Sequence, residues 1–413
     1  MTDSTSPGDP VEAACALYEQ ATAAHAAGDA DTAGALFGQA LRLFEAAEGP
    51  ASLNAAATLN CLGAIAEDQS AYAQAAAYYQ RAVTIVDHNT TYDPQDDETA
   101  RAMPEEVVRL RLDAWRNLGW LRRIAGHFDD AEQLFHKALR LAEAFFGPDS
   151  DETAWVCNDL GMVGKFAGHF TAAAQWYARA LTILTAHHGP DDSALAALYH
   201  NLGGLEHARG AFATGEPLAR RAVEIRTRTL GPDHPDVAAD MAALAALLDG
   251  QGKYDEAEAL YHQALAIFRR TYGEEHYEIA VNLHNLAAIR QAQERFAEAE
   301  DLYRQVLAIK AKLFDADNVE IALTLHNLAV LYTAMAREDE AAALLQRALA
   351  IFTRTLRDAH PHVLACRETP GRVAVPASKI APLFHISSYM RALRDSCQPI
   401  SPTICSSPAG MRS

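Results

Sequence analysis

Asparagine and histidine side chains recur in this chain at a spacing of 42 residues, and both can hydrogen-bond to a peptide backbone. One register of this series holds Asn117, Asp159, Asn201, Asn285 and Asn327. The position just before it holds Asn158, His200, His284 and His326. An asparagine side chain offers both a donor and an acceptor, so a row of them can hold a peptide main chain whatever its sequence. The alternative is that these side chains only join neighbouring helices to each other.

Cations and aromatic residues gather in one part of this series. They are Arg116, Trp120, Arg123, Trp155, Lys165 and Phe166. The chain is otherwise acidic, with 35 Lys and Arg against 54 Asp and Glu and a net charge of -19. Exposed cations beside aromatic rings suit an acidic peptide with an aromatic or apolar anchor. The alternative is that the cations pair with neighbouring acids such as Asp113 and Asp159.

Other chemistries find little support in the sequence. It contains no phosphate-binding GxxxxGK[ST] loop, no GxSxG nucleophile motif, no HExxH pair and no CxxC pair. His200, His284 and His326 recur at equivalent positions, which in stacked hairpins lie ~10 Å or more apart. Ligands of one metal ion must come within ~2 Å of it. We therefore expect no metal site, no cofactor and no enzymatic activity.

Composition narrows the class of partner and the compartment. A strongly acidic chain is a poor ligand for nucleic acid, whose phosphates require cations. No run of about 18 apolar residues is present to cross a membrane. The first ten residues lack the basic and apolar regions of a secretory signal, and the cysteines are scattered. We expect a cytoplasmic protein whose partner is a protein or a peptide.

The side chains described above are positioned by a repeat. A marker leucine recurs every 42 residues at Leu118, Leu160, Leu202, Leu244, Leu286 and Leu328. Around Leu244, apolar residues spaced by three and four positions predict one helix, here called helix A. A Gly-containing turn follows, and Asp255 is the expected N-cap of a second helix, helix B, which carries Tyr261. The pattern predicts an all-α fold of about eight helical hairpins over residues 11–358.

The repeat resembles a known family. Residues 252–257 (GKYDEA), followed by Tyr261 and Ala264, resemble the tetratricopeptide repeat, and the 42-residue period and residues 230–235 (LGPDHP) resemble its kinesin-light-chain type. The resemblance implies a right-handed α-solenoid whose A helices line a concave peptide-binding groove. It places the polar series in that groove, with the cations and aromatics in repeats three and four. We therefore expect the binding site in the groove of repeats three to five. The implied function is a non-catalytic scaffold or adaptor. The alternative is a regulatory receptor that closes around a small signalling peptide, and an enzyme built on the repeats is a distant third.

Three segments depart from the repeat. Fourteen extra residues lie near 87–107, where we expect Pro104 to kink or break an extended helix A. Residues 1–10 are expected to be disordered. Residues 359–413 begin like another helix A and then become rich in Pro and Ser, which predicts a partial capping helix and a tail. The tail is interpreted as disordered or as the product of a reading-frame change.

Overall fold

The computed structural model describes residues 9–69, 71–89, 93, 96–356, 358 and 361–368. Eighteen helices and no strands occur in these segments. They divide into two compact units, and the boundary falls after Val163, inside a helix. We call the described residues up to 163 the N-terminal unit and those from 164 the C-terminal unit. Most of the predicted segment 1–10 and all of the tail from 369 lie outside the described residues.

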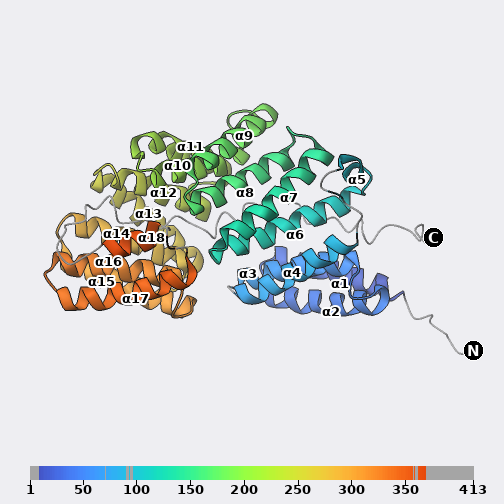
Figure 1. The fold of residues 1–413 in the computed structure, drawn as a ribbon, viewed down its shortest axis with the longest axis horizontal. Helices are drawn as coiled ribbons and strands as arrows, with labels where there is room; N and C mark the ends of the chain where they lie inside the picture. The colour runs from blue at the N-terminus through green and yellow to red at the C-terminus, as the bar shows by residue number, and fades with distance from the viewer. Residues whose placement is uncertain are drawn as a thin grey trace, which may run out of the picture. The chain divides into compact units, whose positions relative to one another are not determined.

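The N-terminal unit contains three hairpins and the start of a fourth (Figure 1). Its helices are α1 (Pro10–Ala26), α2 (Ala30–Glu48), α3 (Leu53–Asp68), α4 (Tyr72–His88), α5 (Asp97–Arg101), α6 (Glu105–Ile124), α7 (Phe128–Phe146) and the first part of α8 (Asp151–Ala167). Within each of the three hairpins the two helices pack together, and α2 packs on α3 and α4 on α6. Each hairpin therefore contacts its neighbours in sequence, as the repeat predicts.

The C-terminal unit continues the same arrangement. Its helices after α8 are α9 (Phe170–His188), α10 (Ser193–Ala208), α11 (Phe212–Leu230), α12 (Pro235–Asp249), α13 (Tyr254–Tyr272), α14 (Tyr277–Ala292), α15 (Phe296–Leu313), α16 (Val319–Ala334), α17 (Glu338–Thr355) and α18 (Pro361–Glu368). Counting both units, α1–α4 and α6–α17 form eight consecutive pairs, so the predicted number of hairpins is confirmed. The A helices that carry the predicted site are α6, α8, α10, α14 and α16.

The helices begin and end where local chemistry favours it. Asp192 and Asn318 cap α10 and α16 by accepting hydrogen bonds from backbone amides of the first turn. The expected cap at Asp255 is wrong, because α13 begins at Tyr254 and Lys253 holds the N-cap position without a side-chain bond. Asp255 lies in the first turn instead, where its negative charge still favours the helix N-terminus.

The turn between helices A and B requires one residue with positive φ. In four successive repeats this residue is a glycine, for example Gly210 with φ 73° and Gly252 with φ 76°. One and two periods later the same position is held by Glu294 with φ 59° and Ala336 with φ 58°. A side chain in this left-handed region costs energy that glycine does not incur. The last two turns are therefore strained relative to the others.

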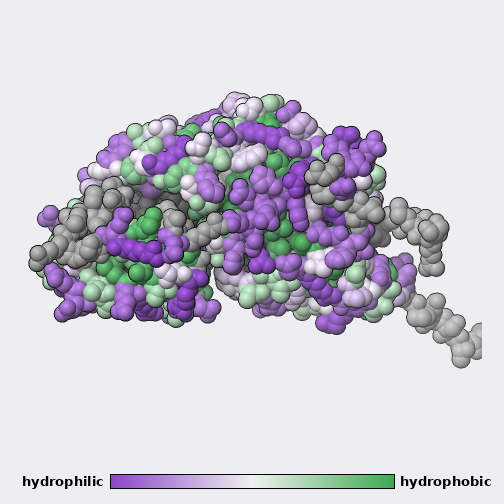
Figure 2. Space-filling view, in the orientation of Figure 1, coloured by the Kyte–Doolittle hydropathy of each residue, from purple (hydrophilic) through white to green (hydrophobic). Residues whose placement is uncertain are grey.

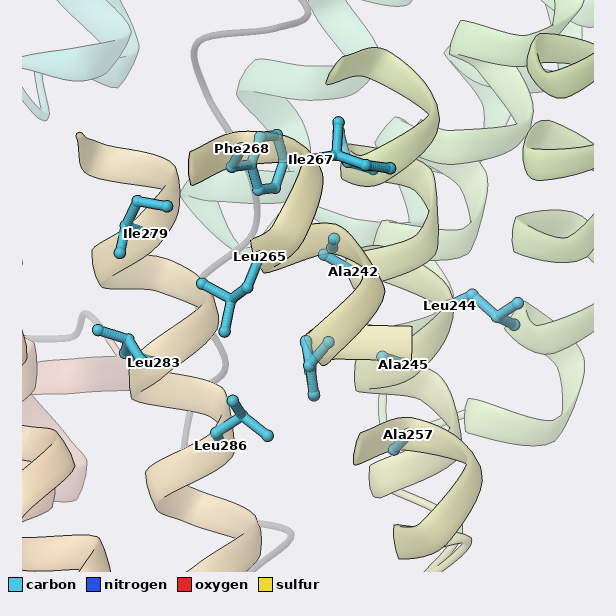
Figure 3. Close-up of a cluster of buried hydrophobic side chains, with 14 of the residues drawn as sticks. Ala242, Leu244, Ala245, Ala257, Leu265, Ile267, Phe268, Ile279, Leu283 and Leu286 are labelled. Carbon is cyan, nitrogen blue, oxygen red and sulfur yellow. The ribbon is translucent and has the colours of Figure 1, made fainter. Parts of the chain in front are cut away.

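Alanines and large apolar residues share the core of each hairpin. In the cluster formed by α12, α13 and α14, Ala242 lies on α12 while Leu265 and Phe268 lie on α13, facing Ile279 on α14 (Figure 3). Small residues let two helices approach, and the large ones fill the remaining volume. Hydrophilic side chains cover much of the face in Figure 2. Within the described residues, no helix is long and apolar enough to cross a membrane.

Short helices lie at the insertion and at the end of the array. The short α5 stops at Arg101, and Pro104 is the N-cap residue of α6, so Pro104 breaks the extended helix as predicted. At the other end, α18 buries Val363 and Cys366 in a cluster with Phe352 of α17. A short helix thus covers part of the last hairpin.

Candidate peptide-binding face

A buried ion pair occupies the predicted site in the N-terminal unit. Arg116 on α6 donates from Nε to Oδ2 of Asp159 on α8 at 2.6 Å. The Asp159 side chain is 0% exposed and that of Arg116 is 11% exposed. Burial raises the pKa of the Asp159 carboxyl, and the Arg116 guanidinium opposes this rise. The expectation that Arg116 is an exposed cation is therefore wrong. Arg116 instead pairs with Asp159, which was the alternative that the sequence left open.

Trp120 and Arg123 belong to the same cluster. The indole Nε1 of Trp120 donates to Oδ1 of Asp159 at 3.3 Å, and its ring is buried. The Arg123 guanidinium lies 4.6 Å from the centre of that ring, and its side chain is buried too. Asn158 is also buried. These side chains form a well-packed polar core between α6 and α8, while Asn117 and Trp155 remain partly exposed.

Lys165 and Phe166 lie at the end of α8, in the C-terminal unit. The Lys165 ammonium is 5.0 Å from the centre of the Phe166 ring, a distance at which a cation is attracted to an aromatic face. Burial, together with the nearby Lys165 ammonium, lowers the pKa of His207 to about 3. His207 is therefore neutral at pH 7, and the positive charge of this region resides on Lys165.

His200 on α10 is joined to the next repeat. Its Nδ1 donates to Oδ1 of Asp240 on α12 at 2.7 Å, and Arg226 of α11 donates to the same oxygen at 2.8 Å. All three side chains are buried. A carboxylate that is shared by two basic side chains is well compensated, so His200 acts here as a link between successive A helices. Its neighbour Asn201 is buried as well.

His284 repeats this arrangement two hairpins later. Asn327 Nδ2 on α16 donates to His284 Nε2 at 2.6 Å. Lys310, buried on α15, donates to Glu320 Oε2 at 2.9 Å and to Thr324 Oγ1 at 3.1 Å. Burial lowers the pKa of His284 well below its usual range, and the Lys310 ammonium lowers it further. Asn327 and His284 thus bridge two repeats, as the alternative interpretation of the polar series proposed.

Two members of the series differ from these bridges. His326 is partly exposed on α16, and burial lowers its pKa. Asn285 is buried, but its Oδ1 has no hydrogen-bond partner among the described residues. No group of three His, Cys, Asp or Glu side chains in the described part of the chain is placed to hold a metal ion. His200 and His284 instead bond to different neighbours, Asp240 and Asn327.

The comparison with protein families agrees with the repeat geometry. A model described as tetratricopeptide repeat matches residues 12–87, 110–186, 194–270, 243–312 and 278–354. The chain belongs to the tetratricopeptide repeat family. No curated protein matches it.

Several solved tetratricopeptide structures are similar to it. The Rap conjugation gene regulator of plasmid pLS20, in complex with the Phr* peptide, is 15% identical, with 84% of this chain and 95% of that chain covered and a TM-score of 0.58. A Rap protein complexed with competence and sporulation factor is 14% identical, with 83% and 99% covered and a TM-score of 0.54. A putative kinesin light chain repeat protein of Podospora anserina is 27% identical, with 50% and 99% covered and a TM-score of 0.39. At these identities the Rap structures establish a shared fold.

The structure adds residues that were not singled out from the sequence. In each repeat, one residue lies five positions after the marker leucine. In five of the repeats this residue is Glu67, Arg123, Lys165, His207 or Asp249. Arg123 and Lys165 were singled out by their charge, whereas Glu67, His207 and Asp249 were not. Their shared offset from the leucine is the signal that could have identified them.

Proposed function

We propose that this tetratricopeptide protein is a non-catalytic, cytoplasmic scaffold or adaptor that binds peptide segments of other proteins along its A helices. The observation that carries the proposal is the recurrence of polar side chains at one register of successive A helices. Some of these side chains are already used to join repeats. Others keep hydrogen-bonding capacity, such as Asn285, whose buried Oδ1 has no hydrogen-bond partner among the residues that the structure describes.

The chemistry of the ligand follows from two partly exposed aromatic residues and from the buried Lys165 beside one of them. Trp155 and Phe166 offer aromatic surface, and aromatic contacts supply a large share of binding energy in many interfaces. Lys165 supplies positive charge beside Phe166. We therefore propose an acidic peptide with an aromatic or apolar anchor, while Arg116 positions α6 against α8.

The test is selection of random-sequence peptides displayed on phage against the full chain. We expect enrichment of peptides that combine acidic with aromatic or apolar residues. Trp155→Ala should weaken their binding at least tenfold, because it removes contact area without removing a buried hydrogen bond. The control is Arg140→Ala, an exposed residue of the B helix α7. Equal loss in both variants, or no enriched peptide, would refute the proposal.

A regulatory receptor is the second candidate function. Two observations favour it, namely the similarity in fold to Rap proteins solved with peptides and the division of this chain into two compact units. A receptor that closes around its peptide should become more compact, whereas a passive scaffold should keep its radius of gyration. Small-angle X-ray scattering with and without an enriched peptide separates the two functions.

A further inference from the structure

The last described helix, α18, lacks the partner that its counterparts have. In the three preceding hairpins, helix A packs against the helix B that follows it in sequence. α18 begins where a ninth helix A is expected, since Pro361 lies 42 residues after Val319, the first residue of α16. It packs on α17 but ends at Glu368 after eight residues, whereas α16 has sixteen. Among the described residues, no helix B follows α18 to complete a ninth hairpin.

The exposure of Leu364 marks the face of α18 that a ninth helix B would cover. Leu364 lies six positions before residue 370, where the period would place the next marker leucine and the sequence has a proline. Its side chain is 42% exposed. The residues six positions before the marker leucine in the seven preceding repeats are all buried, at 0–5% exposed. They are Ala56, Leu112, Ala154, Ala196, Ala238, Ala280 and Ala322.

In the preceding hairpins, the residue at this position packs in one core cluster with a residue of its own helix B. Three such pairs are Ala238 with Ala264, Ala280 with Val306, and Ala322 with Ala348. All six side chains are 0% exposed. In each pair the residue of helix B lies 26 positions after the residue of helix A. The same offset from Leu364 leads to Met390.

The sequence around Met390 has the pattern of an amphipathic helix. Residues 380–395 read IAPLFHISSYMRALRD. The apolar residues of this segment recur at three and four positions, which places them on one helix face. They are Leu383, Ile386, Met390 and Leu393. Residue 380 lies 42 positions after Glu338, the first residue of α17, and Pro382 falls in the first turn, where proline is tolerated.

We propose that residues 380–395 of this chain dock on α18 as the second helix of a ninth hairpin, with Met390 against Leu364. The proposal replaces the interpretation of this part of the tail as disordered, and it is independent of the peptide-binding face. The intervening residues 369–379 can span up to about 35 Å, which exceeds the ~10 Å between packed helices. A leucine fits at this position, since Leu112 is buried there in the third repeat. Arg391 and Arg394 give the segment a positive charge that suits a chain with a net charge of -19.

Amide hydrogen exchange of the full chain, followed by mass spectrometry, tests this docking. In the wild type, we expect residues 384–394 to exchange about tenfold or more slowly than an unstructured peptide. Leu364→Asp changes an exposed residue of α18 and should abolish this protection while leaving exchange in α16 and α17 unchanged. Met390→Asp should also abolish it and should speed exchange in α18. The matched control is Ser388→Asp, which adds the same charge on the polar side of the segment and should leave the protection intact.

Three results would overturn the proposal. The first is exchange of residues 384–394 in the wild type at the rate of an unstructured peptide, which would support a disordered tail. The second is protection that survives both Leu364→Asp and Met390→Asp, which would mean that the segment docks elsewhere. The third is protection of α18 that depends on protein concentration, because a second copy of the chain would then cover this face. The peptide selection decides the proposed function separately, since its variants lie in other helices.

Discussion

Removal of the Arg116 side chain should destabilise the protein far more than a surface substitution would. Arg116→Met keeps the aliphatic part of the side chain but removes the cation that bonds to Asp159. The Asp159 carboxylate, which is 0% exposed, then keeps only its hydrogen bond from Trp120 at 3.3 Å among the bonds described above. Breaking a buried pair in this way costs about 3–5 kcal/mol of unfolding free energy. An exposed pair is worth about 0–1 kcal/mol. The structure therefore predicts a loss near 3 kcal/mol or more at pH 7.

The assay is urea denaturation followed by tryptophan fluorescence, which reports on Trp120 within the same cluster. The control is Arg109→Met on the same helix, since Arg109 pairs with Glu105 at 2.8 Å and Glu152 at 3.0 Å but its side chain is 45% exposed. Arg109→Met should cost at most about 1 kcal/mol.

The double variant Arg116→Met/Asp159→Asn completes the test. Asparagine removes the buried charge and can still accept from Trp120, so the double variant should be more stable than Arg116→Met alone. If Arg116→Met costs no more than Arg109→Met, the Asp159 carboxylate is solvated and the assignment of Arg116 to packing rather than to ligand binding is refuted.

Three further predictions concern stability. Ala336→Gly should stabilise the protein by about 1 kcal/mol in thermal unfolding, because glycine adopts the left-handed conformation of residue 336 without strain. Gly252→Ala should destabilise it by a similar amount for the same reason, since the added Cβ meets no other atom. Gly63→Ala should cost about 1–3 kcal/mol in the same assay, because its Cβ would lie 2.3 Å from the buried Tyr79 ring; an unchanged melting temperature would contradict this. Burial raises the pKa of Asp249 to about 7, so the native state binds this proton more tightly than the unfolded state and stability falls as pH rises from about 4 to about 7. Asp249→Asn should therefore stabilise the protein by about 2–4 kcal/mol at pH 8 and by almost nothing at pH 4, as denaturation at the two pH values would measure.

The hairpins could be predicted from the sequence because each one is a local pattern. The marker leucines and the glycine turns fix where helices begin and end, and Pro104 breaks its helix for a reason contained in one residue. The prediction of an N-cap at Asp255 failed because α13 begins at Tyr254, two residues after the left-handed Gly252. Asp255 therefore lies inside the first turn of the helix.

The burial of the site could not be predicted in the same way. Arg116 and Asp159 are 43 residues apart, one more than the period, and whether they touch depends on how successive A helices stack. The same holds for His284 and Asn327. From the sequence, these residues could either bond to the neighbouring repeat or bind a ligand. The packing between successive repeats decides which of the two occurs.

The acidic residue five positions after the marker leucine illustrates a signal that was present in the sequence but unused. Comparison of Asp249 with Glu67 at the same offset shows a shorter side chain at one of two equivalent positions. Only the structure shows that Glu67 accepts a hydrogen bond from Tyr79 at 2.6 Å.

Amide hydrogen exchange of the full chain, with and without the tightest peptide from the selection, tests the central claim most directly. If the A helices form the binding face, the peptide should slow exchange in A helices such as α8 and α10 more than in the B helices α9 and α11. Protection confined to the B helices, or no protection with a saturating peptide, would contradict the account.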